Sequence, residues 1–582
     1  MCGIFGFSNF KNDEIERARL ALHTMQHRGP DQWNEFVDEK VYLGHRRLSI
    51  LDLSEKGKQP ITNADGSIWI TVNGEIYNFQ TLRKELEINY VFNSKSDSEV
   101  LLHGYSAWGL QGLLERIDGM FAFALYDKRN GKLFIVRDRI GIKPLYYSLS
   151  NNRLMWASEL KAIRTFAGEE SLEIDYTALY DFFTYQYIPA PKSLYNDVHK
   201  LKPAEYIEFD IASGSHRQVQ YWSLPVQERS ISAKQAEQEV YFLLDKSVRE
   251  QMMSDVPLGF FLSGGMDSSA VVALASLAKA DVNTFTIGFD KDPDDESKYA
   301  AIVADYFKTK HHERILDGST TASLFPKIKE WYDEPFGDIS CFPSYLVSKV
   351  SKEQATVVLT GDGGDELFAG YKWYAAFALI KKYNLRWFSF ARSLVNPFLY
   401  KKGKLGALSK KLEWLFLSDM ELYTRLMGGL LMEEKSALRK AWAISDAYDD
   451  YWYFRKYYRE DLPVVKRLQY LDFHTYLPDD ILTKVDRVSM AVSLECRVPF
   501  LSRELVECAF TLPQSVVLPK GRLKGLLKDA FRHVLPSQII TRGKKGFSPP
   551  IQVWRSELYK QFKTRHYKIV EEVFKFSTTA KK

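Results

Sequence analysis

The chain has few cysteines, and none of them lie at a disulfide-type or zinc-type spacing. Its 582 residues contain four, Cys2, Cys341, Cys496 and Cys508, and no CxxC pair. Four cysteines are too few to stabilise a chain of this length by disulfide bonds, which excludes a disulfide framework. The lack of a CxxC pair excludes a zinc site built on paired cysteines. The same scarcity predicts a reducing compartment, so we expect a cytoplasmic protein.

No segment has the composition of a secretion signal or a membrane span. The residues after Met1 lack a basic stretch followed by a long apolar core, and acidic residues begin at Asp13. The longest apolar-looking stretch, 256–278, is interrupted by Ser263-Gly264-Gly265 and by Asp267. We therefore predict a strand, a loop and a helix in that stretch and no contact with a membrane.

A strong excess of one charge is also missing. The 79 Lys and Arg residues against 74 Asp and Glu leave a net charge of +5, too small over this length to predict a nucleic-acid partner. At 45% hydrophobic and 26% charged residues, the composition is that of a folded globular protein. Because domains usually span roughly 100 to 200 residues, we expect at least two cores.

Short strand patterns dominate the first 200 residues or so. Apolar runs cover 69–72, 120–126, 133–136 and 154–157, and Asn130-Gly131 is a strong hairpin signal between two of them. In 120–126 large apolar side chains alternate with alanine, so both faces of the strand are apolar and should be covered. The helical patterns at 13–25 and 98–108 are suited to form the layers that cover the strand. The strand runs and the turn between them predict an antiparallel, sheet-rich first domain.

The second half of the chain has a different pattern. After a polar stretch at 227–235, strand patterns alternate with helical ones, which predicts a parallel sheet covered by helices, and the pattern beyond about residue 375 is mainly helical. The strands are expected at 258–262, 284–289 and 357–360, and the helices at 268–279 and 298–307. We predict a first domain at 2–210, a linker at 211–235, a second domain at 236–560 and a tail at 561–582.

Two loops rich in glycine and aspartate follow predicted strands of the second domain. They are Ser263-Gly264-Gly265-Met266-Asp267-Ser268-Ser269 and Gly361-Asp362-Gly363-Gly364-Asp365-Glu366. Glycines at a helix N-terminus let backbone N–H groups approach an anion, and parallel strands bring both loops to one edge of the sheet. Carboxylates clustered there suit Mg²⁺ bridged to phosphate oxygens. An ordinary turn remains an adequate explanation for Asp362 taken alone.

The first of these loops resembles the SGGxDS pyrophosphate loop of the N-type ATP pyrophosphatases, which split ATP to AMP and pyrophosphate while they adenylate a substrate oxygen. The resemblance implies that Asp267 and Asp365 bind magnesium pyrophosphate. It also implies that the segment Gly521-Arg522-Leu523-Lys524-Gly525 carries a catalytic lysine, Lys524, near the α-phosphate. The remaining residues that it implies around ATP are Leu262, Ser263, Gly264, Gly265, Ser268, Ile287 and Gly361.

The start of the chain offers a nucleophile and a base in one residue. Removal of Met1 would expose the α-amine of Cys2, whose ordinary pKa of roughly 7.7 to 8.0 suits a general base for the adjacent thiol. Five motifs in order resemble the class II, N-terminal nucleophile, glutamine amidotransferases. These are Cys2-Gly3-Ile4-Phe5-Gly6, His27-Arg28-Gly29-Pro30-Asp31, Arg47-Leu48-Ser49-Ile50, Asn73-Gly74-Glu75-Ile76-Tyr77-Asn78 and Ser96-Asp97-Ser98-Glu99.

That resemblance implies a role for each matching residue. Cys2 attacks the glutamine carboxamide, and Asn73 with the backbone N–H of Gly74 holds the oxyanion. Arg47 binds the α-carboxylate of glutamine and Asp97 its α-ammonium, with Glu75 also at the glutamine site. His27 is expected to be a structural member of its loop.

Together the halves resemble the glutamine-hydrolysing asparagine synthetases over nearly the whole chain. The fold implied is an N-terminal Ntn-type αββα sandwich followed by a doubly wound parallel α/β sheet with a helical C-terminal extension. The activity implied is release of ammonia from glutamine, its passage through an internal tunnel, and ATP-dependent adenylation of the aspartate β-carboxylate with Mg²⁺, giving asparagine, AMP and pyrophosphate. A homodimer would be ordinary for this family.

Two alternatives stay open. Thr360 and Asp362 stand where some asparagine synthetases have Ser and Glu, and the form found here also occurs in relatives encoded with polysaccharide-synthesis enzymes. The acceptor is therefore aspartate or another carboxylate, such as a uronic acid sugar, and the segment 333–340 is expected to border its pocket. The alternative from another class is a glutaminase or regulatory module without synthetic activity.

Glu495 and Arg497 would share one face of an extended segment and form a buried pair.

Overall fold

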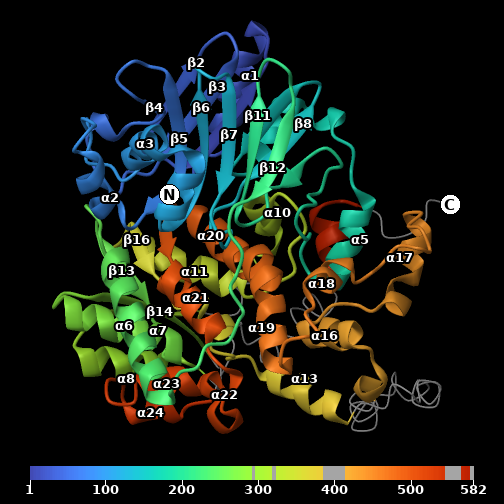
Figure 1. The fold of residues 1–582 in the computed structure, drawn as a ribbon. Helices are drawn as coiled ribbons and strands as arrows, with labels where there is room; N and C mark the ends of the chain where they lie inside the picture. Colours follow the sequence, from blue (N-terminus) through green and yellow to red (C-terminus); the bar gives the residue numbers. More distant parts are fainter. Residues whose placement is uncertain (291–294, 317–322, 384–412, 544–564, 577–582) are drawn as a thin grey trace.

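The computed structural model describes residues 1–290, 295–316, 323–383, 413–543 and 565–576. Figure 1 shows a sheet-rich first half, drawn in blue to cyan, stacked on a second half drawn in green to red. The first half contains two six-stranded sheets, and every strand pair recorded in them is antiparallel.

The strand order of the first sheet is β10, β8, β9, β1, β3, β2, and that of the second is β12, β11, β7, β6, β5, β4. The strands of the first sheet are β1 (Gly3–Ser8), β2 (Gln32–Val37), β3 (Val41–Arg47), β8 (Tyr146–Ser150), β9 (Arg153–Ala157) and β10 (His199–Lys200). The strands of the second are β4 (Ile61–Thr62), β5 (Ile68–Ile76), β6 (Gly119–Asp127), β7 (Lys132–Arg137), β11 (Glu205–Asp210) and β12 (His216–Gln220).

Helices cover the outer faces of both sheets. Helices α1 (Ile15–His23) and α4 (Leu160–Ala167) pack on the first sheet, while α3 (Glu99–Arg116) packs on the second and α2 (Phe79–Leu86) packs against α3. Alternate residues of β6 explain this arrangement, because Phe121 and Phe123 pack toward the helices while Ala122 and Ala124 pack between the sheets. The predicted αββα sandwich and the two-sided burial of residues 120–126 are confirmed, as is the hairpin at Asn130-Gly131, which joins β6 to β7.

The second half contains a five-stranded parallel sheet in the order β15, β14, β13, β16, β17. Its strands are β13 (Leu258–Phe261), β14 (Asn283–Phe289), β15 (Lys310–Leu316), β16 (Val357–Leu359) and β17 (Glu495–Arg497). The chain builds the sheet outward from β13 in one direction and then returns to add β16 and β17 on the other side. The switch point therefore lies between β13 and β16, the two strands that precede the glycine and aspartate loops, and ligands of such sheets bind there.

Helices pack on both faces of this sheet, so the predicted doubly wound architecture is confirmed. The helices nearest the sheet are α6 (Ala233–Gln251), α7 (Met266–Ala278), α8 (Ser297–Phe307), α11 (Cys341–Lys352), α20 (Thr483–Met490) and α23 (Gly525–Ala530). The further elements are α5 (Tyr176–Tyr185), α10 (Ile328–Tyr332), α12 (Gly364–Leu367), α13 (Lys372–Lys382), α16 (Asp419–Met427), α17 (Ser436–Ala441), α18 (Trp452–Tyr457), α19 (Val464–His474), η8 (Leu477–Leu482), α21 (Arg503–Thr511), α22 (Gln514–Val517), α24 (Ser537–Thr541), α26 (Arg565–Lys568) and η11 (Ile569–Val573).

The segment boundaries differ in detail from those expected. Strand β12 lies inside the predicted linker and pairs with β11, so the first domain extends beyond residue 210. The predicted tail includes α26 and η11, where Ile569 and Val570 are buried because their apolar side chains pack near α10. The predicted boundary at residue 560 lies outside the described residues.

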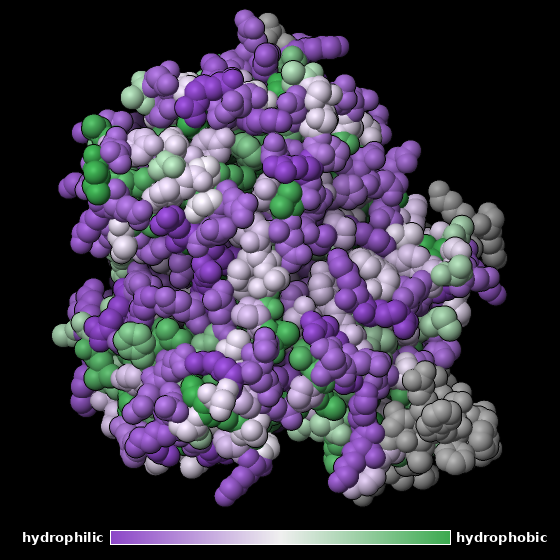
Figure 2. Space-filling model, in the orientation of Figure 1, coloured by the Kyte–Doolittle hydropathy of each residue, from purple (hydrophilic) through white to green (hydrophobic). Residues whose placement is uncertain are grey.

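Over the ranges that the structure describes, no helix is both long enough and apolar enough to cross a membrane. Figure 2 shows one face of the molecule, on which hydrophobic residues form small separate groups among hydrophilic ones.

Candidate functional site

The nucleophile expected from the sequence lies at the start of β1, beside β5. The backbone N–H of Cys2 donates a hydrogen bond to Asn73 Oδ1 at 3.0 Å, and both residues are buried. Gly74 follows on β5, where a side-chain Cβ would come within 2.0 Å of the Met120 carbonyl oxygen. Strands β5 and β6 can approach this closely only because residue 74 has no side chain.

The other residues expected at the glutamine site surround this point. Asp97 Oδ2 accepts a hydrogen bond from Ile76 N–H at 2.7 Å, which ties its carboxylate to the end of β5. Burial and the neighbouring Asp97 carboxylate raise the pKa of Glu75, whereas Arg497, 3.5 Å away, opposes that shift. Burial also raises the pKa of the Cys2 thiol. The structure thus brings Cys2, Asn73, Glu75 and Asp97 into one buried, charged region.

Arg47 is the member of this set whose terminal guanidinium nitrogens already hold protein acceptors. Its guanidinium donates to the backbone carbonyls of Leu51, Asp52 and Ser54, with distances of 3.1, 2.5 and 3.2 Å. These bonds anchor the loop that follows β3. His27 contacts both carboxylate oxygens of Glu159 at 3.1 Å, in agreement with its expected structural position.

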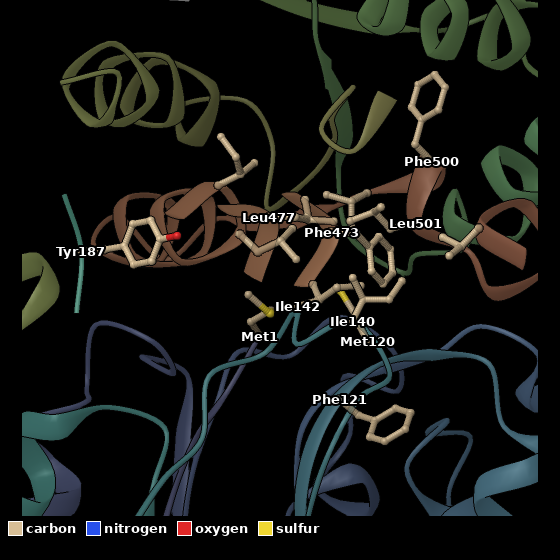
Figure 3. Close-up of a cluster of buried hydrophobic side chains, with 14 of the residues drawn as sticks. Met1, Met120, Phe121, Ile140, Ile142, Tyr187, Phe473, Leu477, Phe500 and Leu501 are labelled. Atoms are coloured by element: carbon tan, nitrogen blue, oxygen red, sulfur yellow. The ribbon is translucent and has the colours of Figure 1, made fainter. Parts of the chain in front are cut away.

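Residues of the second domain close the Cys2 region. The α-ammonium of Met1 lies 2.8 Å from Glu495 Oε2, and both side chains are fully buried. Figure 3 shows Met1 with Met120, Ile140 and Ile142 facing Leu477 across the boundary between the domains. Removal of Met1, which the expected nucleophile requires, would therefore vacate volume at the domain interface.

The second site is a cavity of about 1060 Å³ at the switch point of the parallel sheet. Of the residues expected around ATP, all except Gly264 line it: Leu262, Ser263, Gly265, Asp267, Ser268, Ile287 and Gly361. Gly264 has a φ of +67°, and a Cβ there would come within 2.5 Å of Tyr299 and of the Ala300 backbone. Gly264 therefore packs against Tyr299 and Ala300 instead of lining the cavity. Its carbonyl accepts a hydrogen bond from Arg542 at 2.8 Å.

Lys524 lies between the two aspartates expected to bind magnesium. Its Nζ pairs with Asp267 and with Asp365 Oδ1, the latter at 2.5 Å. Two loops and the segment before α23 therefore converge on one point of the cavity. No group of three His, Cys, Asp or Glu side chains suited to a metal occurs in the described part of the chain. Two carboxylates are, however, the protein ligand set that Mg²⁺ uses when phosphates supply the rest.

The cavity also contains residues that the sequence did not reveal. Lys484 of α20 donates to Asp338 at 3.0 Å and to Ser340 at 2.8 Å. Burial opposes ionisation of Asp338, yet Lys484 and the Ser340 hydrogen bonds hold its pKa at about 2. Tyr371, Trp373 and Tyr476 form an aromatic wall, with the first two rings stacked at 3.8 Å. Lys484 and the three aromatic residues come from segments far apart in the chain, and no local pattern marks them, whereas Asp338 and Ser340 belong to the expected segment 333–340.

The segment 333–340, expected to border the acceptor pocket, is divided between two environments. Asp338 and Ser340 line the cavity, whereas Asp333 and Glu334 pair with Lys161 and Lys200 of the first domain. Only the end of the segment therefore contributes to the cavity wall.

Strand β17 separates the two sites. Arg497 donates to Glu495 at 2.7 Å, which confirms the buried pair expected on one face of this segment. Both side chains face the first domain, where they meet Met1 and Glu75. Cys496, between them, lines the nucleotide cavity on the other face. A strand three residues long is thus a common wall of both sites.

Fold and sites define a two-domain protein in which an N-terminal amidotransferase-type sandwich is joined to a nucleotide-binding α/β domain. The chain belongs to the asparagine synthase family: the family model described as asparagine synthase matches residues 239–571, and the one described as glutamine amidotransferase domain matches residues 1–222.

Individual relatives agree with this assignment. "Asparagine synthetase [glutamine-hydrolyzing] 1" of Bacillus subtilis is 33% identical over 95% of this chain and 88% of its own length. "Putative asparagine synthetase [glutamine-hydrolyzing] 2" of Methanocaldococcus jannaschii is 40% identical over 64% of this chain and 76% of its own length. "Amidase chry2" of Gibberella zeae is 27% identical over 93% of this chain and 86% of its own length.

Proposed function

We propose that this protein is a glutamine-dependent asparagine synthetase. It hydrolyses glutamine to glutamate and ammonia in the first domain, and adenylates the aspartate β-carboxylate with ATP in the second. Ammonia then displaces AMP to give asparagine. The observation that carries the proposal is the shared wall at β17, which has the Cys2 region on one face and the nucleotide cavity on the other.

In the first domain, the Cys2 α-amine freed by removal of Met1 takes the thiol proton, and the thiolate attacks the glutamine carboxamide. The side-chain amide of Asn73 and the backbone N–H of Gly74 would stabilise the oxyanion. The leaving ammonia carries the transferred proton, and water hydrolyses the thioester to glutamate. Arg47 and Asp97 would hold the α-carboxylate and α-ammonium of glutamine, with Glu75 beside them.

In the second domain, the loop 263–268 would hold the phosphates of ATP, with backbone N–H groups at the start of α7 facing the anion. Asp267 and Asp365 are the residues that would hold Mg²⁺, which neutralises phosphate charge when it is bound. Lys524, freed from these carboxylates, would stabilise charge that develops at the α-phosphate. Exclusion of water from the cavity during the reaction would protect the acyl adenylate from hydrolysis.

A second candidate acceptor has its own support. The cavity has an aromatic wall of Tyr371, Trp373 and Tyr476, on which a sugar ring could stack, and a relative that matches 93% of the chain is named an amidase rather than an asparagine synthetase. A larger carboxylate, such as a uronic acid sugar, is therefore the alternative substrate for the same chemistry. We further propose a cytoplasmic location and a homodimer, as in the family that the chain belongs to.

The test is a mass-spectrometric product assay on purified protein with glutamine, ATP, Mg²⁺ and aspartate. Asparagine, AMP and glutamate formed in step support the proposal. Glutamate without asparagine or AMP contradicts aspartate as the acceptor, and sugar acids are then tested in its place. Absence of ATP binding together with retained glutaminase activity supports a module without synthetic activity.

A further inference from the structure

Arg28 connects the second domain to the main chain of the proposed nucleophile. Its Nε donates to the Cys2 carbonyl oxygen at 3.0 Å, and its two terminal nitrogens donate to Asp486 at 2.8 and 3.1 Å. Arg28 is completely buried, and Asp486 is 3% exposed. A paired, two-point contact fixes the plane of a guanidinium, so Asp486, with Glu159 at 2.9 Å from the same group, orients Arg28 toward Cys2.

Asp486 belongs to a helix that also forms part of the nucleotide cavity. Within α20, Lys484, Val485 and Val488 line that cavity, and Lys484 holds Asp338 there. Asp486 and the next residue, Arg487, instead contact the first domain, where Arg487 pairs with Glu159 at 3.0 Å. One two-turn helix therefore touches both sites through adjacent residues.

We propose that Asp486 is a positioning residue for the glutaminase: it acts through Arg28 on the backbone of Cys2, and α20 transmits occupancy of the nucleotide cavity to the nucleophile. The inference rests on the proposed role of Cys2. Without the Asp486 carboxylate, Arg28 keeps only Glu159 as a charged partner, at 2.9 Å, and its guanidinium can turn away from the Cys2 carbonyl. The nucleophile then loses a fixed orientation while the glutamine-binding groups remain in place.

The test compares Asp486→Asn with Asp479→Asn and the unchanged protein. Asp479 is a matched control, because it is an equally buried interface carboxylate that accepts from Ala190 N–H of the first domain at 2.8 Å and has no recorded bond to Arg28. Glutamate release is measured with and without ATP, Mg²⁺ and the acceptor. Ammonia-dependent AMP formation in the same preparations reports whether the second domain is intact.

We expect Asp486→Asn to lower the kcat for glutamine about 10- to 100-fold with little change in KM, as misplacement of a reacting group does. Ammonia-dependent synthesis should stay within about twofold, and Asp479→Asn should resemble the unchanged protein. We also expect ligands of the nucleotide cavity to raise glutamate release in the unchanged protein but not in Asp486→Asn. The double variant Asp486→Asn with Arg28→Gln should be no slower than Arg28→Gln alone, because both changes act on one contact.

Three results would overturn the inference. Equal loss of both activities in Asp486→Asn would make the residue merely structural. Unchanged glutamine kinetics would remove its positioning role, and glutamate release indifferent to cavity ligands in the unchanged protein would remove the transmission through α20. A Cys2→Ala variant that still hydrolyses glutamine would instead contradict the proposed function itself, so the two failures can be told apart.

Discussion

Cys2 is the single residue on which the division of labour between the domains depends. Its thiol is buried, its backbone N–H is bonded to Asn73, and its carbonyl is bonded to Arg28. Within the ranges that the structure describes, every residue that lines the nucleotide cavity belongs to the second domain. Chemistry at Cys2 and chemistry at the phosphate loop therefore use separate sets of side chains.

We expect Cys2→Ala to abolish glutamine-dependent synthesis and to leave ammonia-dependent synthesis within about twofold of the unchanged protein. Loss of the sulfur removes the nucleophile, while the second domain keeps its own groups. Both rates are measured as AMP formation with glutamine or with ammonium chloride as the nitrogen source. Joint loss of the two rates would refute the division of labour.

Asp472 of α19 illustrates how burial sets the charge of a single residue. The hydroxyls of Tyr374 and Tyr423 donate to its carboxylate oxygens. Burial raises the pKa of Asp472 to about 7, and the hydrogen bonds only partly oppose this. The folded protein therefore keeps this carboxyl protonated at pH values where the unfolded chain, with an ordinary pKa of about 4, has lost the proton.

Because the folded state binds more protons in this range, the Asp472 contribution lowers stability as the pH rises toward 7. Asp472→Asn cannot ionise. As the pH rises from 5 to 8, we therefore expect its free energy of unfolding to increase by about 3 kcal/mol relative to that of the unchanged protein. Urea unfolding of both proteins at several pH values measures this. Asp461→Asn is the control, because the pKa of this exposed carboxyl is lowered and it stays ionised in that range. Parallel curves for Asp472→Asn and the unchanged protein would contradict the prediction.

At the scale of elements, the loop after β13 carries the clearest agreement between sequence and structure. Its glycines and aspartate predicted a phosphate loop at a sheet edge, and the loop borders the cavity at the switch point. Gly264 departs from the expectation in one respect, since it lies behind the loop rather than in the cavity wall.

We expect Gly264→Ala to raise the KM for ATP at least about tenfold, because the added Cβ would meet Tyr299 and Ala300 at 2.5 Å and displace the loop. Gly131→Ala is the matched control, since its φ of +62° imposes a similar backbone strain in open space. That strain costs roughly 1 to 2 kcal/mol of stability without touching the cavity. AMP formation at varied ATP concentrations measures both variants, and equal KM values would contradict the role of the loop.

Motifs that are contiguous in the chain were predictable, whereas contacts between distant segments were not. The alternation of aromatic and alanine residues in 120–126 predicted a strand buried on both faces, because the period of a strand is a local property. The pairing of Arg28 with Asp486 joins residues that are 458 positions apart. Arg28 lies in a motif that the sequence analysis identified and Asp486 in a segment that it did not, and only the docking of the two domains makes them partners. The same holds for Lys484 and Asp338 in the cavity.

At the scale of the whole molecule, buried charged contacts hold the two domains together. Arg28 with Asp486, Glu75 with Arg497, and Lys200 with Glu334 all cross the boundary. Apolar side chains also pack across the boundary, and Figure 3 shows Met120, Ile140 and Leu477 among them. Breaking such contacts exposes both apolar surface and unpaired charge, and the loss of one partner of a buried ion pair typically costs about 3 to 5 kcal/mol.

The link between the domains has no regular structure, although some of its residues contact the second domain, such as Trp222, whose Nε1 donates to Glu507 at 2.9 Å. Residues 221–232 contain no helix or strand, and Gln227 and Glu228 are exposed. We therefore expect a protease site inserted after Gln227 to be cut readily, and the two fragments to remain together during size-exclusion chromatography in moderate salt. Glutamine-dependent AMP formation should survive the cut within about twofold, because the contacts at β17 and α20 do not depend on chain continuity.

An Arg28→Gln version of the cut protein should separate more easily, since it leaves Asp486 buried without its two-point partner. Fragments of the otherwise unchanged protein that elute apart would show that the linker, and not the interface, holds the two sites against their common wall.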